Sequence, residues 1–269
     1  MDDFDADTAI DATGTESLAG VITGRWSIAD RPNGGYLMAM GVRALATALP
    51  HPDPLTVTGH FLRSPVAGPM TAEVESIREG RTVSTGQARL FQNGREFLRL
   101  IGTFGDLRAA EGVTDIQVKP PGMPDLEDCI RAAPDGLLPD GTLISIMQRL
   151  DVRMAPDALG WLRGEPADRA EVRAWIRFRD GGSASLVSLA LIVDAVAPAV
   201  LSAGHRGSVP TIELTTHFRG HPAPGWLRLV TRTRALIDGY LDEEAEIWDS
   251  EDRLVATGRQ FARLAGAGE

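Results

Sequence analysis

The 269-residue chain is 43% hydrophobic and 24% charged, which is typical of a globular protein with room for a sizeable core. Its formal net charge of −10 argues against nucleic acid or an anionic membrane as a partner, because both attract basic surfaces. One cysteine, Cys129, excludes an internal disulfide framework and favours a reducing, cytoplasmic location. Five scattered histidines predict no metal site, and the acidic N-terminus lacks the features of a signal peptide.

The first half of the chain shows one helix pattern between strand patterns. We expect the first dozen residues to be loosely ordered, and a strand over residues 20–28. Apolar residues at helical spacing predict a helix over 36–49. Strand-like segments follow, and Asn93-Gly94 between the last two is typical of a hairpin turn. These segments are 55–63, 70–79, 84–92 and 95–105.

The second half repeats this order after a connector. Residues 106–141 are rich in proline, glycine and charge, and we expect a short helix near 125–133. An apolar stretch then predicts a core helix over 183–197, which is apolar on nearly every side. The strand-like segments of this half are 149–155, 171–180, 211–219, 226–236, 240–249 and 253–264.

An offset of 157 residues relates the two halves. It pairs Phe61 in "GHFLRSPVAGPM" with Phe218 in "THFRGHPAPGWL". The same offset pairs His60 with His217, Pro65 with Pro222, Gly68 with Gly225 and Phe104 with Phe261. A period this long indicates two copies of a domain. We therefore predict an α+β fold with an N-terminal domain over 1–105, a linker over 106–141 and a C-terminal domain over 142–269, each with a long helix packed on a curved antiparallel sheet.

Asp194 is the single charged residue in the apolar stretch 183–204. An ionised carboxylate there costs several kcal/mol unless it is paired or hydrogen-bonded. We expect it well inside the helix, with Ser183 or Ser185 as the N-cap. Two interpretations stay open: a structural aspartate bound to an arginine or to backbone amides, or a catalytic one.

Gln260 and Thr211 favour the catalytic interpretation. Alternation along the last strand makes Gln260 the single polar residue on a face of small apolar ones, with Arg259 and Arg263 on the opposite face. Thr211 begins the strand after the helix. Each has a structural alternative, an amide bonded to a strand end and a β-branched residue at a strand start. Together with Asp194 they would hold one water, with the carboxylate accepting its proton.

The first half lacks this set of polar residues. The offset places Pro54 opposite Thr211 and Thr103 opposite Gln260. Ala44 falls opposite Asp194 when the two helices are aligned from their starts. We therefore expect chemistry in the second half only.

Three segments resemble the type II (TesB-like) acyl-CoA thioesterases, which have a double hot-dog fold. They are "LIVDAVAP", "PTIELTTHFRGHPAPGWL" and "RLVATGRQFARL", and the resemblance extends from about residue 20 to 264. It implies that Asp194, Thr211 and Gln260 are catalytic and activate water. It also implies an acyl-CoA substrate without further cofactor, a role in lipid metabolism and a homo-oligomer, a dimer or larger.

The helix start in the first half is a candidate substrate-binding site. Asn33, Gly34 and Gly35 precede the apolar helix, where glycines permit close approach and free N–H groups would stabilise an oxyanion. The structural alternative is that these glycines permit tight helix–sheet packing. Three arginines, Arg63, Arg219 and Arg232, are candidates for the phosphates of coenzyme A.

Three other functions stay open. A non-catalytic acyl-CoA- or lipid-binding protein is the main alternative, and a structural protein is another. Hot-dog hydratases and dehydratases use a catalytic histidine with an acidic partner on the helix. Neither predicted helix holds a histidine, so we place that function last.

Overall fold

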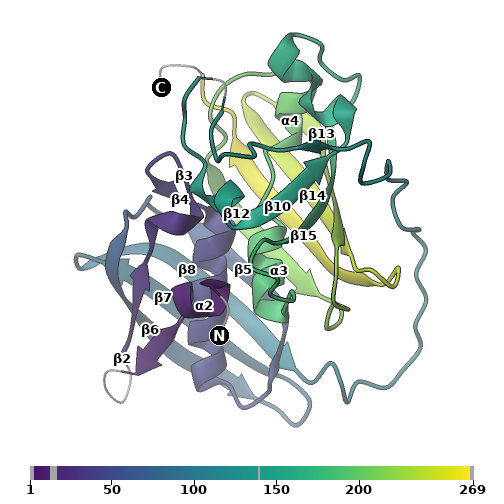
Figure 1. The fold of residues 1–269 in the computed structure, drawn as a ribbon. Coiled ribbons are helices and arrows are strands. Elements are labelled where there is room, and N and C mark those ends of the chain that lie inside the picture. Colours follow the sequence, from purple (N-terminus) through teal and green to yellow (C-terminus); the bar gives the residue numbers. More distant parts are fainter. Residues whose placement is uncertain (1–2, 13–16, 139, 267–269) are drawn as a thin grey trace.

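A thirteen-stranded antiparallel sheet runs through the computed structural model, which describes residues 3–12, 17–138 and 140–266 (Figure 1). The strand order is β1-β2-β6-β7-β8-β5-β12-β15-β14-β13-β11-β10-β9. The elements up to residue 105 are α1 (Asp3–Asp7), β1 (Ile10–Ala12), β2 (Ser17–Ile22), η1 (Gly24–Trp26), β3 (Ser27–Ile28), β4 (Arg31–Pro32), α2 (Gly34–Ala48), β5 (Asp53–Phe61), β6 (Gly68–Glu79), β7 (Ser84–Gln92) and β8 (Arg95–Gly105).

The later elements complete the sheet and add two short α-helices. They are β9 (Ile130–Arg131), η2 (Ser145–Gln148), β10 (Leu150–Met154), η3 (Pro156–Arg163), β11 (Glu171–Phe178), α3 (Leu186–Ile192), α4 (Ala199–Ser202), β12 (Thr211–Phe218), β13 (Leu227–Ile237), β14 (Tyr240–Trp248) and β15 (Leu254–Arg263). Within the described residues, no helix is long and apolar enough to cross a membrane.

Helix α2 forms the core of the first half. It lies against the sheet formed by β5 to β8 (Figure 1), and its residues from Gly35 to Val42 are buried. Small residues allow the close approach: a Cβ on Gly41 would lie 2.6 Å from the Leu100 side chain in β8. The sheet and helix α3 together bury the helix on nearly every side, as the apolar helix pattern predicts.

The two halves meet at β5 and β12, which pair antiparallel near the middle of the sheet. Thr58 lies directly opposite Thr215, and their hydroxyl oxygens are 2.8 Å apart. These two residues are 157 positions apart in the chain, which is the offset found in the sequence. The pairing is symmetric about this contact. The offset makes Val57 equivalent to Leu214 and Gly59 equivalent to Thr216, and each residue pairs with the equivalent of the other: Val57 with Thr216, and Gly59 with Leu214.

Helices α2 and α3 also contact each other, and this contact joins the halves on the inner side of the sheet. Gly35 in the first turn of α2 packs against the end of α3. A Cβ on Gly35 would lie 2.7 Å from the carbonyl oxygens of Ala190 and Leu191. Only a residue without a side chain fits at this distance.

The structure confirms most predicted strands and corrects four local expectations. A single strand over 20–28 is wrong, because β2 ends at Ile22 and is followed by η1 and β3. Strands β7 and β8 have the bounds expected from the alternation and the Asn-Gly turn. Residues 3–12 are not loosely ordered, because α1 buries Phe4 against Trp26 and Phe178; residues 1–2 lie outside the described part of the chain. The helix expected near 125–133 is wrong: this part contains a turn, and β9 pairs with β10. The helix expected over 183–197 is only seven residues long, Leu186–Ile192.

Replacing Gly35 by alanine tests the contact between α2 and α3. We expect Gly35→Ala to lower the free energy of unfolding by about 1–3 kcal/mol, because the new methyl group would overlap backbone atoms that have no rotamer to change. Urea unfolding measures the difference. Gly24→Ala is the matched control, since nothing lies within 4 Å of a Cβ there. Equal stability of the two variants would contradict the close contact.

Candidate functional site

Asp194 follows helix α3 rather than lying inside it, which corrects the sequence-based expectation. The helix ends at Ile192, and the amides of Asp194 and Ala195 bond to the carbonyls three residues earlier, at 3.1 and 3.2 Å. In a continuous helix, the carbonyl of Asp194 would accept a bond from residue 198. That residue is Pro198, which has no N–H and whose ring would clash with this carbonyl. The proline therefore prevents the helix from continuing past this point, and Asp194 lies in a turn.

Asn33 binds Asp194 from the other half of the chain. Its amide nitrogen Nδ2 donates to the backbone carbonyl of Asp194 at 2.9 Å and to the carboxylate Oδ2 at 3.1 Å. Its Oδ1 accepts the N–H of Tyr36 at 3.0 Å, so the same side chain caps helix α2. Gly35 N–H donates to Asp194 Oδ2 at 2.9 Å. The carboxylate thus lies at a helix N-terminus, where the free amides favour negative charge.

Burial raises the pKa of Asp194 from 3.8 to about 6, and the bonds from Gly35 and Asn33 oppose this rise. The surroundings are tight and partly apolar. A Cβ on Gly34 would lie 3.0 Å from Asp194 Oδ2 and 3.2 Å from the ring of Phe61. No cation forms an ion pair with Asp194 among the described residues. A carboxylate of this kind is ionised at neutral pH and can still accept a proton.

Gln260 and Thr211 lie on the inner face of the sheet. Gln260 is 5% exposed, and its neighbours across the sheet are Leu214 on β12 and Glu243 on β14. Thr211 lies opposite Ala262, which is fully buried. Paired residues project to the same side of a sheet, so both polar side chains point toward the helices, as the alternation in β15 predicts.

The chain between α3 and α4 covers this inner face. Val193 lies over Gly258, where a Cβ would be 3.1 Å from the valine Cβ. Ala199 N–H donates to the Glu243 carboxylate at 2.5 Å. These contacts bracket Asp194 and place its turn above β14 and β15. No direct hydrogen bond joins Asp194, Thr211 and Gln260 in the part of the chain that the structure describes.

The helix start that the sequence singles out for substrate binding also holds Asp194: Asn33 Nδ2 and Gly35 N–H donate to its carboxylate. Gly34 N–H is the first-turn donor of α2 without an acceptor among the described residues. Three residues expected to bind substrate therefore form one cluster with the carboxylate.

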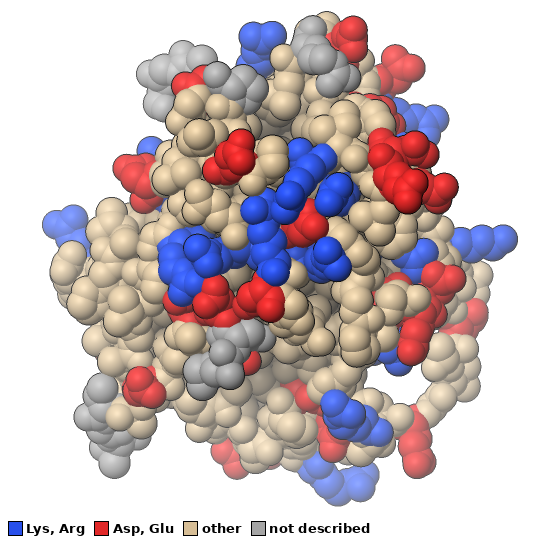
Figure 2. Space-filling view, in the orientation of Figure 1, with Lys and Arg blue, Asp and Glu red and all other residues tan. Residues whose placement is uncertain are grey.

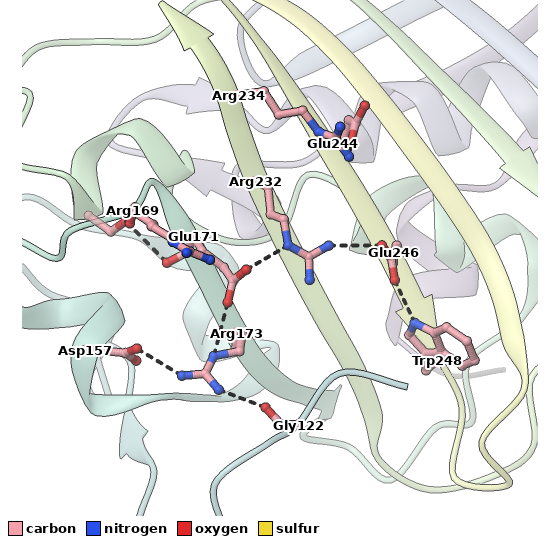
Figure 3. Close-up of polar contacts among 11 residues, drawn as sticks. Gly122, Asp157, Arg169, Glu171, Arg173, Arg232, Arg234, Glu244, Glu246 and Trp248 are labelled. Carbon is pink, nitrogen blue, oxygen red and sulfur yellow. Dashed lines mark hydrogen bonds and ion pairs between the residues drawn. The ribbon is translucent and has the colours of Figure 1, made fainter. Parts of the chain in front are cut away.

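Arg232 is not available for a phosphate, in contrast to the sequence-based expectation. It lies between Glu171 and Glu246, at 2.7 and 3.0 Å, on the outer face of the sheet (Figure 3). Glu171 also contacts Arg173. The guanidinium is therefore used within a network of ion pairs.

Basic side chains gather over the region of β10 (Figures 1 and 2), although the chain is acidic overall. Asp151 in β10 is 5% exposed and forms ion pairs with Arg131, Arg153 and Arg177. One carboxylate thus holds three guanidinium groups on this face. Within the described residues, no group of three His, Cys, Asp or Glu side chains could hold a metal ion.

Glu243 is a polar residue of this face that the sequence reading missed. It is 7% exposed and lies in the acidic run "LDEEAEIW". Alternation places it on the same side as Leu241, Ala245 and Ile247, which are buried. This alternation is the sequence feature that predicts burial of Glu243.

Two family models match this chain, both of acyl-CoA thioesterase domains. Residues 126–264 match the model of the acyl-CoA thioesterase C-terminal domain, and residues 22–105 match that of the N-terminal domain. A proposed thioesterase II from Thermobifida fusca is 33% identical, with a TM-score of 0.88 over 99% of this chain and 98% of that one.

Two further solved structures share the fold. A hot-dog protein of unknown function from Alicyclobacillus acidocaldarius is 21% identical, with a TM-score of 0.86 and 99% of each chain covered. The acyl-CoA thioesterase II TesB2 of Mycobacterium marinum is 19% identical, with a TM-score of 0.75 over 98% of this chain and 99% of that one. The resemblance noted in the sequence is confirmed, and the α+β fold has hot-dog neighbours.

The raised pKa of Asp194 predicts a pH-dependent stability. Its folded pKa of about 6 lies above the ordinary value of 3.8, so the folded protein holds this proton more tightly than the unfolded chain. The stabilisation is present at low pH and is lost as the pH rises through about 6. The amide of Asp194→Asn does not ionise, so its free energy of unfolding should not fall in this way. Relative to the unmodified protein, we expect the variant to become more stable by about 2 kcal/mol as the pH rises from 4 to 8. Urea unfolding at both pH values measures this, and parallel pH curves would contradict it.

Proposed function

Because the chain belongs to the acyl-CoA thioesterase family, we propose that it hydrolyses acyl-CoA thioesters to the free acid and coenzyme A. The observation that carries this proposal is the Asp194 carboxylate. It has a raised pKa, no cationic partner among the described residues, and a fixed position above the face that holds Gln260. A group so placed suits the activation of a water molecule.

The two oxygens of Asp194 have different roles in the proposed reaction. Oδ2 is held by Gly35 and Asn33, which leaves Oδ1 to accept a proton from water. Gln260 and Thr211 orient that water from the inner face of the sheet. Its oxygen bonds to the acyl carbon while its proton passes to Asp194. The carbon–sulfur bond then breaks, and the proton passes from Asp194 to the departing thiolate.

Gly34 N–H is our candidate for stabilising the oxyanion of the intermediate. It belongs to the first turn of α2, where backbone N–H groups lack partners within the helix. The absence of a side chain at Gly34 matters, since a Cβ there would press against Asp194 and Phe61. The glycine therefore leaves the amide accessible beside the carboxylate.

We also infer that the two halves are copies of one hot-dog unit, over 1–105 and 142–269, with a linker over 106–141. The symmetric pairing of β5 and β12 about Thr58 and Thr215 supports this inference. The two separate domain matches support two units as well, although the second match begins at residue 126, before the end of the linker. In this arrangement the first copy supplies the helix start, and the second supplies the carboxylate, the hydroxyl and the amide.

Substitutions at the three proposed catalytic residues test the function. We expect Asp194→Asn to abolish thiol release from acyl-CoA, because an amide cannot take the proton from water. Thr211→Val and Gln260→Leu should lower kcat roughly 10- to 1,000-fold, because the water loses one of its orienting bonds. A panel of acyl-CoA chain lengths in a thiol-release assay provides the measurement.

Arg259→Gln is the matched control, since Arg259 neighbours Gln260 but is exposed on the other face. It should keep full activity. Turnover by Asp194→Asn at the unmodified rate would rule out the proposed mechanism. Binding of acyl-CoA by the unmodified protein without thiol release would favour the non-catalytic acyl-CoA-binding function instead.

A further inference from the structure

Glu243 is a second buried carboxyl group beside the candidate site, and the proposed reaction does not use it. Its side chain lies on the inner face of β14 with 7% exposure. No cation forms an ion pair with it in the described part of the chain. A buried carboxylate without a positive partner is costly. Glu243 therefore either keeps its proton or is stabilised as an anion by hydrogen bonds.

One contact ties Glu243 to the turn that carries Asp194. Its Oε2 accepts the N–H of Ala199 at 2.5 Å. Ala199 is the first residue of α4 and follows Asp194 by five residues. The bond therefore anchors the far end of the turn on the sheet, while Val193 over Gly258 anchors the near end.

The neighbours of Glu243 on the inner face are polar but carry no positive charge. Gln260 lies opposite it on β15 and Thr233 opposite it on β13. The charged residues next to it along the strands project from the outer face. They include Asp242, Glu244, Glu246, Arg232 and Arg259 (Figure 3 shows Glu244, Glu246 and Arg232).

Asp194 is the titratable group whose charge acts on Glu243. Burial and the Asp194 charge raise the pKa of Glu243 from 4.5 to about 7, against the bond from Ala199 N–H and the nearby Thr233 hydroxyl. Asp194 titrates near 6. In the interval between these values, Asp194 is ionised and Glu243 is still protonated.

We propose that Glu243 is a positioning residue for the thioester hydrolysis, which holds the Asp194 turn through Ala199 and switches the site off when it ionises. This inference rests on the proposed function. The tetrahedral intermediate carries an oxyanion close to Asp194, which has by then taken up the proton of the water. A second carboxylate on the same inner face would add a further negative charge there, in surroundings that screen charge poorly.

The consequence is a narrow pH range for activity. The rate rises with pH as Asp194 ionises near 6, and it falls as Glu243 ionises near 7. Such a bell shape reports the pair of groups. We assign the fall in rate at high pH to Glu243, because ionisation of Asp194, which acts as the base, can only raise the rate.

Glu243→Gln tests this inference. The amide oxygen of glutamine can still accept the Ala199 N–H, but the side chain no longer ionises. We expect the alkaline limb to disappear, so that kcat/KM at pH 8 exceeds that of the unmodified protein about 10-fold and the acid limb near pH 6 is kept. Glu244→Gln is the matched control on the same strand, because Glu244 faces outward and pairs with Arg234. It should keep the bell shape.

Two outcomes would overturn the inference. One is an alkaline limb in Glu243→Gln equal to that of the unmodified protein. The other is full activity of Glu243→Leu, which removes the acceptor for Ala199 N–H; we expect this variant to lose at least 10-fold in kcat and Glu243→Gln to restore it.

A titration separates this inference from the proposed function. The ¹³C chemical shift of the Asp194 carboxyl should show a second step near pH 7 in the unmodified protein, and none in Glu243→Gln. This readout needs no turnover. If the second step is present but no acyl-CoA is hydrolysed, the proposed function fails while the coupling stands; if the step is missing, the coupling fails.

Discussion

The hydrogen bonds from Asn33 and Gly35 to Asp194 are the contact on which the site depends. They join the N-terminus of α2 to the end of α3, so one half of the chain supplies the donors and the other supplies the carboxylate. The carboxylate is partly buried, and among the described residues no cation neutralises it and its hydrogen bonds go to Oδ2. A salt bridge would have lowered its pKa and its basicity, whereas two neutral donors hold it in place and leave it basic.

Two carboxyl groups on one side of the sheet constrain each other. Asp194 lies above the inner face and Glu243 lies on it, and Ala199 links the second to the turn of the first. Charging either group makes charging the other harder. The amide of Gln260 and the carboxyl of Glu243 are cross-strand neighbours under the turn of Asp194. Polar groups without a positive partner, placed together in this way, can bind a water molecule and assist a reacting carboxylate.

The strands were predictable because their signals are local. Alternation and the Asn93-Gly94 turn define β7 and β8, and alternation in β15 separates buried Gln260 from exposed Arg259. The end of α3 was also encoded locally, since Pro198 stands four residues after Asp194, but the apolar composition of the stretch outweighed that signal. The bond between Gly35 and Asp194 spans 159 positions. Neither periodicity nor composition reports on a partner so far away in the chain, so the contact of Asn33 and Gly35 with Asp194 could not be predicted from the sequence.

The starts of the two core helices explain why one site forms rather than two. Helix α3 begins with a capping box, in which the hydroxyls and amides of Ser185 and Ser188 satisfy each other. Helix α2 begins with Asn33, whose oxygen caps the helix while its NH₂ group is left to bind across to the other half. A serine hydroxyl has a single O–H to donate, whereas the NH₂ group of Asn33 has two N–H donors and binds both the carbonyl and the carboxylate of Asp194. The asparagine at one helix start, combined with the proline that exposes the Asp194 carbonyl, therefore breaks the symmetry of the two halves at the place where a carboxylate can be held.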